Sequence, residues 1–213
     1  MNPGSGDPVR HAPLPAHPNP AHVMGMPAQS LQTWTAEAVQ ALPEEIGVRN
    51  ECVDGLLLVS PAPRLVHQIA VSELLVRLMT WCEPTGILWA VSSPIDLILD
   101  PKTLVQPDLS VFRRRADGSY PATVDEAGLP LLVIEVLSPG TARADRFYKR
   151  RRYLQAGIEY LIMDLDSRLV ERWLPGAERP DILAEQVRWH PDGVSAPFVF
   201  DLEPFFTRIL GQP

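Results

Sequence analysis

The sequence predicts an α/β (α+β) fold in which helices flank a mixed central β-sheet. Residues 129–137 form a near-continuous apolar run, which is typical of a strand buried on both faces. Apolar residues recur at helical spacing from Arg64 to Glu83. Short β-type segments lie between that helix and a second one over residues 141–156. Helices and strands in this order favour a sheet that is covered by helices.

The predicted elements follow one another along most of the chain. Asp54-Gly55 between two apolar runs indicates a hairpin over residues 48–60. Thr141 can cap the later helix, and Gly157 can end it. We also expect helices at 36–42 and 204–210, strands at 87–91, 95–99, 105–112, 130–137, 159–165, 169–174 and near Phe198, and a loop at 113–129.

Composition sets the domain organisation. The 213 residues are 46% hydrophobic, which is enough apolar material for one domain with a sizeable core, and we place it at residues 31–213. Residues 1–30 contain seven prolines and three histidines, so they cannot propagate a helix or a ladder, and we expect a disordered tail. The irregular spacing of those histidines favours a solvated segment over a metal site.

Cysteine content and hydropathy bear on the compartment. Cys52 and Cys82 are too few for a disulfide framework or a four-ligand zinc site. No apolar run approaches the roughly 20 residues of a membrane span, and the N-terminus lacks the apolar stretch of a signal peptide. We therefore expect a cytoplasmic protein with no membrane partner. The net charge of −7 favours solubility and argues against a generally basic surface for nucleic acid.

Glu135 stands in the middle of the apolar strand. Burying an isolated ionised carboxylate costs on the order of tens of kcal/mol, so Glu135 needs a metal cation, a basic partner or a raised pKa. An ordinary buried ion pair meets this need as well as a functional site does, so Glu135 alone does not distinguish a functional site from a structural ion pair.

A second acidic residue, Asp108, follows Pro107 inside another β-type segment. Proline cannot donate to a ladder, so we expect the strand to be interrupted or to lie at an edge here, where a side chain can face a cleft. A Pro-Asp pair by itself is common at turns. Asp108 is a stronger candidate for a functional site because Glu135 follows after 26 intervening residues, on what we expect to be the neighbouring strand.

The helix over residues 141–156 supplies a cation. Asp145, Lys149 and Tyr153 recur every four residues and share one face, and the helix begins soon enough after the buried strand to point Lys149 at Glu135. Basic residues gather in this helix and at 113–115, where together they account for nine of the 19 Lys and Arg residues. Such a cluster beside two acids resembles an anion-binding cleft, although several of these arginines fit a solvated helix face equally well.

Together these residues resemble the Uma-two family of endonucleases in the PD-(D/E)XK, or restriction-endonuclease-like, superfamily. The similarity covers roughly residues 33–175. It rests on Asn50-Glu51-Cys-Val-Asp-Gly55, Ser60-Pro-Ala-Pro63, His67-Gln68, Pro107-Asp108, Val-Ile-Glu135-Val-Leu-Ser-Pro, Thr141…Asp145…Lys149…Tyr153 and Gly157-Ile-Glu-Tyr160. The superfamily's usual lysine position holds Leu137 here, whereas the Uma-two pattern carries a lysine on the following helix, which Lys149 matches.

The resemblance implies hydrolysis of a phosphodiester with Mg²⁺ or Mn²⁺, cations that prefer oxygen ligands. Lys149 would orient the attacking water or stabilise developing charge. His67 would contact phosphate or transfer a proton, and a histidine on the helix surface or satisfied in the core is an equal alternative. The implied metal ligands are Asp108, Glu135, Glu51 and a backbone carbonyl such as that of Val136. The implied contacts to nucleic acid, which we expect to be DNA, are Arg143, Arg146, Arg150 and Tyr153. A homodimer would supply the two sites that double-strand cleavage needs.

Two other functions remain open at this point. The first is a nucleic-acid-binding or regulatory module that kept the fold without catalysis, and its binding would not respond to chelators. The second is a hydrolase that uses Asp108 and Glu135 as an acid/base pair and binds no metal. An ordinary ion pair between Glu135 and Lys149 would explain those two residues but leave Asp108 and the clustered arginines unexplained.

Overall fold

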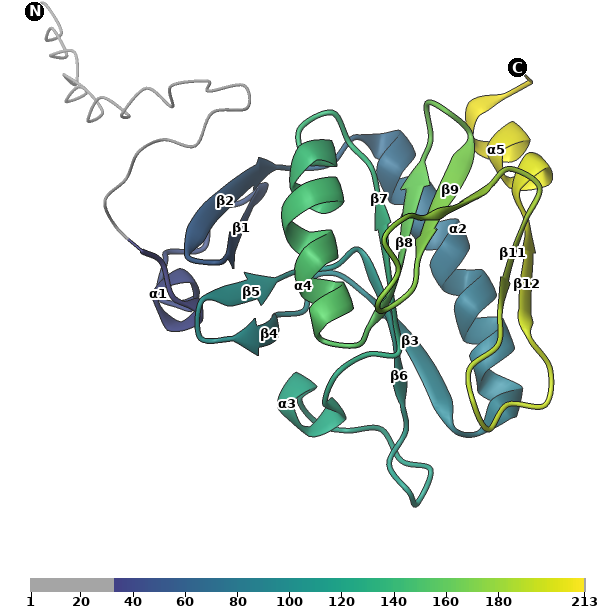
Figure 1. The fold of residues 1–213 in the computed structure, drawn as a ribbon, viewed down its shortest axis with the longest axis horizontal. Helices are drawn as coiled ribbons and strands as arrows, with labels where there is room; N and C mark the ends of the chain where they lie inside the picture. Colours follow the sequence, from purple (N-terminus) through teal and green to yellow (C-terminus); the bar gives the residue numbers. More distant parts are fainter. Residues whose placement is uncertain (1–32, 213) are drawn as a thin grey trace, which may run out of the picture. The chain divides into compact units, whose positions relative to one another are not determined.

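A mixed six-stranded sheet lies at the centre of the computed structural model, which describes residues 33–212 (Figure 1). The predicted tail at 1–30 falls outside the described residues. The strand order is β10-β9-β8-β7-β6-β3, and β7 and β8 form the one parallel pair in this sheet. These strands are β3 (Leu88–Ser92), β6 (Leu109–Arg113), β7 (Leu132–Val136), β8 (Glu159–Asp164), β9 (Leu169–Trp173) and β10 (Asp181–Leu183).

Helices cover both faces of this sheet, which confirms the predicted fold class (Figure 1). On one face lies α2 (Leu65–Cys82), together with β11 (Gln186–Trp189), β12 (Phe198–Asp201) and α5 (Leu202–Leu210). On the other lies the helix that connects β7 to β8. Its first part, η2 (Ala144–Lys149), winds as a π-helix, and it continues as α4 (Arg150–Gln155).

A second, four-stranded sheet has the order β2-β1-β5-β4. The predicted hairpin forms its outer part: Val53 pairs with Leu56, and the two loop residues, Asp54 and Gly55, have φ values of 53° and 80°. Positive φ at both loop positions is the geometry that an Asp-Gly loop favours. The strands are β1 (Val48–Val53), β2 (Leu56–Pro61), β4 (Leu97–Asp100) and β5 (Thr103–Val105), and α1 (Ala36–Gln40) packs beside them.

The segment predicted as one strand at 105–112 is divided between the two sheets. β5 ends at Val105 and β6 begins at Leu109, so Gln106, Pro107 and Asp108 form the junction. The interruption that Pro107 predicts is therefore present, and it places Asp108 directly before a central strand. The predicted loop at 113–129 contains the single turn α3 (Val124–Ala127), and η1 (Glu83–Thr85) follows α2.

Alternation along β7 decides where Glu135 points. Leu132, Ile134 and Val136 pack in the core with α2, whereas Val133 packs in the core that contains Tyr153 of α4. Successive side chains of a strand point to opposite faces, so Glu135 lies on the face of Val133, toward the η2–α4 helix. No helix in the described part of the chain has the length and apolar character needed to cross a membrane.

Candidate functional site

Strand pairing brings the two predicted acids together. β6 and β7 are antiparallel and Leu109 pairs with Ile134, so Asp108 and Glu135 come next in the register. The backbone N–H of Asp108 donates to Glu135 Oε2 at 3.3 Å, and the N–H of Val136 donates to Asp108 Oδ2 at 2.9 Å. The expectation that the two acids stand on neighbouring strands therefore agrees with the structure.

Asp108 is surrounded by donors. Arg49, in β1, donates to Oδ1 through both terminal nitrogens, at 3.2 and 3.3 Å, and His67 Nε2, on α2, lies 3.0 Å from Oδ2. Burial of Asp108 raises its pKa. The contacts with His67, Arg49 and the Val136 N–H outweigh burial and lower the pKa to about 2. Asp108 is therefore held ionised by groups from three different elements.

Lys149 is the centre of a second cluster. Its Nζ lies 2.9 Å from Glu51 Oε1, 3.2 Å from Glu135 Oε1 and 3.2 Å from Asp145 Oδ1. Lys149 is 1% exposed, and the three carboxylates are similarly buried. Burial lowers the pKa of Lys149, but the three carboxylates raise it well above its usual value, so the ammonium stays charged.

Glu135 is less well compensated than Asp108. Burial raises its pKa well above the usual value, Lys149 opposes that shift, and the nearby charges of Asp108, Asp145 and Glu51 reinforce it. The remaining side-chain donor to Glu135 in the described structure is the hydroxyl of Tyr153, at 3.4 Å from Oε1. One lysine shared among three carboxylates cannot neutralise them all.

The charge balance and the donor types fit a divalent metal. The cluster holds four buried carboxylates, whereas its permanent cations are Arg49 and Lys149, so ionisation of all four acids would leave two negative charges without a counter-ion. Carboxylate oxygens suit Mg²⁺ or Mn²⁺. Among residues 33–212 no three His, Cys, Asp or Glu side chains are arranged to bind one ion. Asp108 and Glu135 would therefore need backbone oxygen or water to complete a coordination shell, an arrangement that Mg²⁺ commonly adopts.

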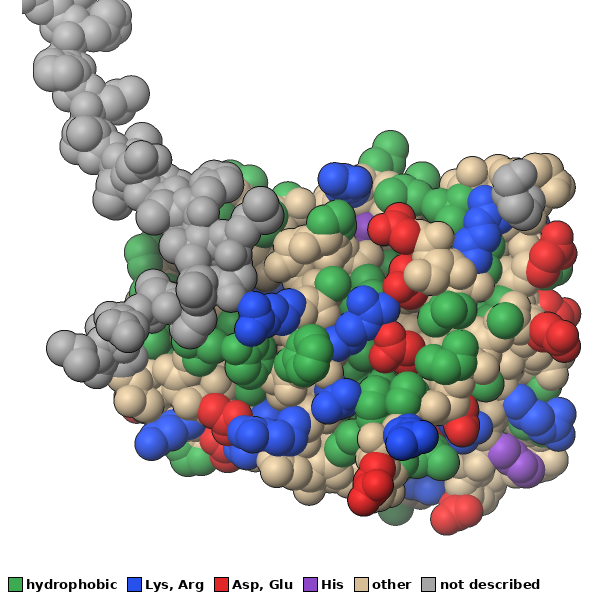
Figure 2. All heavy atoms as spheres, turned by 45° about the horizontal axis from the view of Figure 1, so that its top comes forward, with side chains coloured by type: hydrophobic (Ala, Val, Ile, Leu, Met, Phe, Trp, Pro, Cys, Tyr) green, Lys and Arg blue, Asp and Glu red, His purple; other side chains and the backbone are tan. Residues whose placement is uncertain are grey.

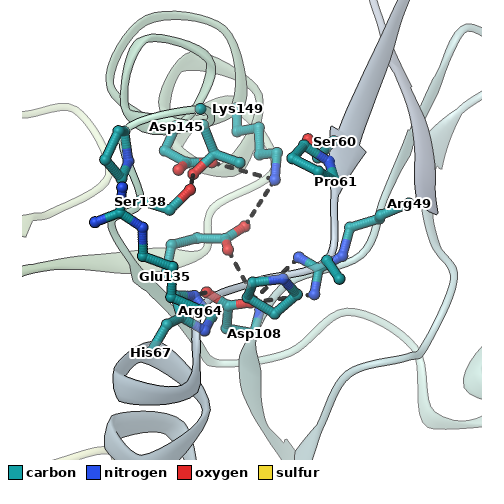
Figure 3. A pocket seen from close by; sticks show the side chains of 15 residues that line it. Arg49, Ser60, Pro61, Arg64, His67, Asp108, Glu135, Ser138, Asp145 and Lys149 are labelled. Atoms are coloured by element: carbon teal, nitrogen blue, oxygen red, sulfur yellow. Dashed lines mark hydrogen bonds and ion pairs between the residues drawn. The ribbon is translucent and has the colours of Figure 1, made fainter. Parts of the chain in front are cut away.

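A cavity of about 200 Å³ opens onto this cluster (Figure 3). Arg49 reaches it from β1, His67 from α2 and Lys149 from the η2–α4 helix (Figure 3). Its walls also include the segment after β2, residues 60–63, and the turn before η2, residues 138–141. Glu51 does not line the cavity: its Oε1 accepts from the Gln106 N–H at 2.7 Å and faces Lys149.

The residues predicted to contact nucleic acid have mixed locations. Tyr153 is fully buried, so its ring cannot touch a nucleic acid, and the prediction for this residue is wrong for the structure as described. Arg146 forms ion pairs with Asp164 at 2.8 Å and Glu171 at 2.7 Å. The Arg150 guanidinium lies 4.1 Å from the centre of the Trp173 ring, whereas Arg143 is exposed.

Acidic neighbours also break up the predicted basic cluster. Arg151 and Arg152 both pair with Asp54, and Arg152 pairs with Asp100 as well. In the described part of the face drawn in Figure 2, Lys and Arg side chains are interspersed with Asp and Glu. The arginine cluster in the sequence is therefore largely a set of structural ion pairs, and it does not form one continuous basic surface.

Two basic side chains of the site were absent from the sequence prediction. The first is Arg49. It lies two residues before Glu51 in β1, so both side chains point to the face of the acid cluster, and this basic-x-acidic spacing in a strand could have predicted it. The second is Arg64, which precedes α2 and lines the cavity. No feature of the sequence distinguishes it from other exposed arginines.

Comparison with known proteins places this geometry in a family. Residues 36–202, more than three quarters of the chain, match the Uma2 family, described as "Putative restriction endonuclease". A crystal structure described as "a putative nuclease belonging to DUF820 from Anabaena variabilis ATCC 29413" is similar in fold, with a TM-score of 0.68 and 21% identity over 83% of this chain and 99% of that chain. No curated protein matches. The chain therefore belongs to the Uma2 family, as its motifs predicted, and this membership supports a nuclease function.

Proposed function

We propose that this protein is an endonuclease that hydrolyses phosphodiester bonds in DNA with Mg²⁺ or Mn²⁺ as cofactor. The observation that carries the proposal is the pairing of Asp108 with Glu135 beside a cavity, in a cluster where four buried carboxylates face two permanent cations. Keeping all four of these carboxylates ionised is costly unless a further cation compensates them.

Asp108, Glu135 and the backbone carbonyl of Val136 are the proposed metal ligands. The N–H and C=O of one residue in an extended strand point to the same side, and the Val136 N–H already points at Asp108. When bound there, a divalent cation supplies a coordinated water of lowered pKa and offsets the charge that builds on the phosphate. Glu51 accepts from Lys149 outside the cavity lining, so we assign it to positioning Lys149.

The chain's own residues hold the two acids in place. His67 and Arg49 orient Asp108, and Lys149 contacts Glu135 directly and opposes the rise that burial causes in its pKa. Lys149 also lines the cavity, so its charge acts on a phosphate placed there. This role for Lys149 as counter-ion is more specific than orienting a water, because three carboxylates lie within 3.2 Å of its ammonium.

Exposed basic residues beside the cavity are the proposed contacts to the DNA backbone. Arg64 lines the cavity and is exposed, and Arg143 is exposed two residues beyond Thr141 of the cavity wall. Phosphate contacts of this kind give affinity without sequence information. A homodimer would bring two such sites to opposite strands, and sedimentation of the protein on duplex DNA tests that assembly.

One observation favours a non-catalytic nucleic-acid-binding module as the second candidate. Both oxygens of Asp108 already accept hydrogen bonds from the protein, so the site is stable as a purely structural cluster. Under this alternative the protein binds nucleic acid equally well in Mg²⁺ and in EDTA and cleaves none of the substrates offered.

A cleavage assay separates the two candidates. Supercoiled plasmid, single-stranded DNA and RNA are incubated with the protein in Mg²⁺, Mn²⁺ or EDTA. We expect metal-dependent nicking of plasmid. Asp108→Asn and Glu135→Gln should each slow it by at least about 100-fold, because each weakens the hold on the cation that would stabilise the developing charge. Glu178→Gln, at an exposed position away from the cavity, is the matched control. Normal cleavage by both acid variants, or cleavage that persists in EDTA, would contradict the proposal.

A further inference from the structure

Arg49 contacts Asp108, one of the two acids that we assign to metal binding, and it lines two neighbouring cavities. Its guanidinium donates twice to Asp108 Oδ1, and Nη1 donates again to the Gln106 carbonyl at 3.0 Å. The cavity of about 200 Å³ at the acid cluster and a neighbouring cavity of about 390 Å³ share Arg49 and Asp108 in their linings. Arg49 therefore has space beside it into which its side chain could move.

The carboxylate of Asp108 has no unused acceptor position. An ionised carboxylate offers about four lone-pair positions in total. Arg49 takes two contacts on Oδ1, and His67 and the Val136 N–H take one each on Oδ2. A cation that binds Asp108 directly must therefore displace at least one of these donors.

The three donors differ in how easily they can move. The N–H of Val136 is fixed by its place in β7, and the side chain of His67 is 8% exposed on α2. The side chain of Arg49 is long and flexible, is 21% exposed and borders both cavities. Arg49 is therefore the donor that can leave at the lowest cost, and Oδ1 is the oxygen that it would expose.

We propose that Arg49 and the catalytic divalent cation are alternative occupants of Asp108 Oδ1. This inference rests on the metal dependence proposed above. Arg49 holds Asp108 in place when no metal is bound, and metal binding requires its guanidinium to withdraw from Oδ1. Exchange of one positive charge for two also removes part of the surplus negative charge of the cluster. Arg49 therefore lowers the metal affinity of the protein while it stabilises the metal-free form.

Calorimetric titration of Mn²⁺ and Mg²⁺ into the full-length protein tests the competition. We expect Arg49→Gln to bind Mn²⁺ roughly tenfold more tightly than the unmodified protein, the change that loss of one competing charge-assisted hydrogen bond produces. Arg49→Lys keeps the charge but cannot form the two-nitrogen contact, so its Kd should fall between the two.

Arg64→Gln is the matched control. Arg64 lines the same cavity and carries the same charge, and it has no ion pair among the residues that the structure describes. Its loss alters the long-range electrostatic field but leaves Asp108 Oδ1 covered. We expect the Kd of Arg64→Gln to change much less than that of Arg49→Gln. An equal change in both variants would mean that charge alone matters, and it would overturn the inference.

Thermal unfolding adds a readout that separates competition from a purely structural role. Without metal, Arg49→Gln should unfold a few degrees below the unmodified protein, and saturating Mn²⁺ should close that gap. A lower unfolding temperature with unchanged or weaker Mn²⁺ binding would show that Arg49 only supports the fold, and would overturn the inference while leaving the proposed function standing. Binding by Arg49→Gln but not by the unmodified protein would support the inference. No Mn²⁺ binding by any variant would overturn both proposals.

Discussion

Asp108 lies in the part of the site that β1 and α2 build, whereas Glu135 lies in the part that the η2–α4 helix covers. We call these parts the Asp108 half and the Lys149 half. Asp108 receives four hydrogen bonds from cationic, imidazole and backbone donors, and its pKa falls to about 2. Burial raises the pKa of Glu135 well above the usual range, and the one lysine that opposes this shift is shared with two other carboxylates.

The difference shows where a metal would have most effect. The Asp108 half is electrostatically complete in the absence of metal, and a cation entering it must compete with Arg49. The Lys149 half lacks positive charge, and a cation beside Glu135 relieves that deficit. Two carboxylates whose environments shift their pKa values in opposite directions are a pattern common in active sites, and here the opposition arises from how many cations each acid shares.

Replacing Lys149 should give the largest effect on the Lys149 half. Lys149→Met leaves three buried carboxylates without their counter-ion, and removal of one partner from a buried ion pair costs on the order of 3–5 kcal/mol. We expect a loss of this size in urea unfolding without metal, partial recovery in Mn²⁺, and no cleavage. Lys102 is the other lysine of the chain and is exposed, so Lys102→Met is the matched control. Equal stability of the two variants would show that Lys149 is not the counter-ion.

Neutral amides at the two acids should change stability in opposite directions. The raised pKa of Glu135 means that the native state retains a proton that the unfolded state loses, so stability falls as pH rises from the unfolded value of about 4.5. Glu135→Gln removes that loss, and in EDTA it should be more stable than the unmodified protein at pH 8, with a gap that narrows toward pH 5.

Asp108→Asn should do the reverse. A pKa lowered from 3.8 to about 2 contributes stability that is present above pH 4 and is lost as the pH falls toward 2. Its loss should cost about 2 kcal/mol at neutral pH, given the 1.36 kcal/mol that each pKa unit represents. Urea unfolding of both variants between pH 5 and 9 measures the contrast. Two variants that destabilise the protein equally at pH 8 would remove the distinction between the halves.

The sequence predicted the acids and the lysine because local patterns place each of them. A carboxylate in a buried strand, an aspartate after a strand-breaking proline and a lysine one helical turn after Asp145 are each visible within a few residues. Arg49 could not be found in this way. It lies 59 residues from Asp108 in the chain, and the two meet through the arrangement of the smaller sheet beside the central one.

The arginine predictions were incomplete for the same reason. Helical spacing shows which arginines share a face, but the acids that neutralise Arg146 come from β8 and β9, and those that neutralise Arg152 come from the β1–β2 turn and the end of β4. Lys149 and Tyr153 are four residues apart and share a helix face, so the spacing that pointed Lys149 at a buried acid also predicted a buried Tyr153. The prediction that Tyr153 contacts nucleic acid conflicted with that spacing. The strands β10 and β11 have only three and four residues, too short a span for a periodic pattern to predict them.

Removing the hydroxyl of Tyr153 should give the smallest effect and test its corrected role. Its contact with Glu135 Oε1 is long, at 3.4 Å, so Tyr153→Phe should cost no more than about 1 kcal/mol in urea unfolding. Because the ring is fully buried, the affinity for a labelled DNA duplex, measured by fluorescence anisotropy, should not change. His67→Phe removes the corresponding donor from Asp108, where the distance is 3.0 Å, and should cost more. A fall in DNA affinity for Tyr153→Phe without a fall in stability would mean that the buried face of the η2–α4 helix opens to the substrate, and the Lys149 half would then be part of the binding surface.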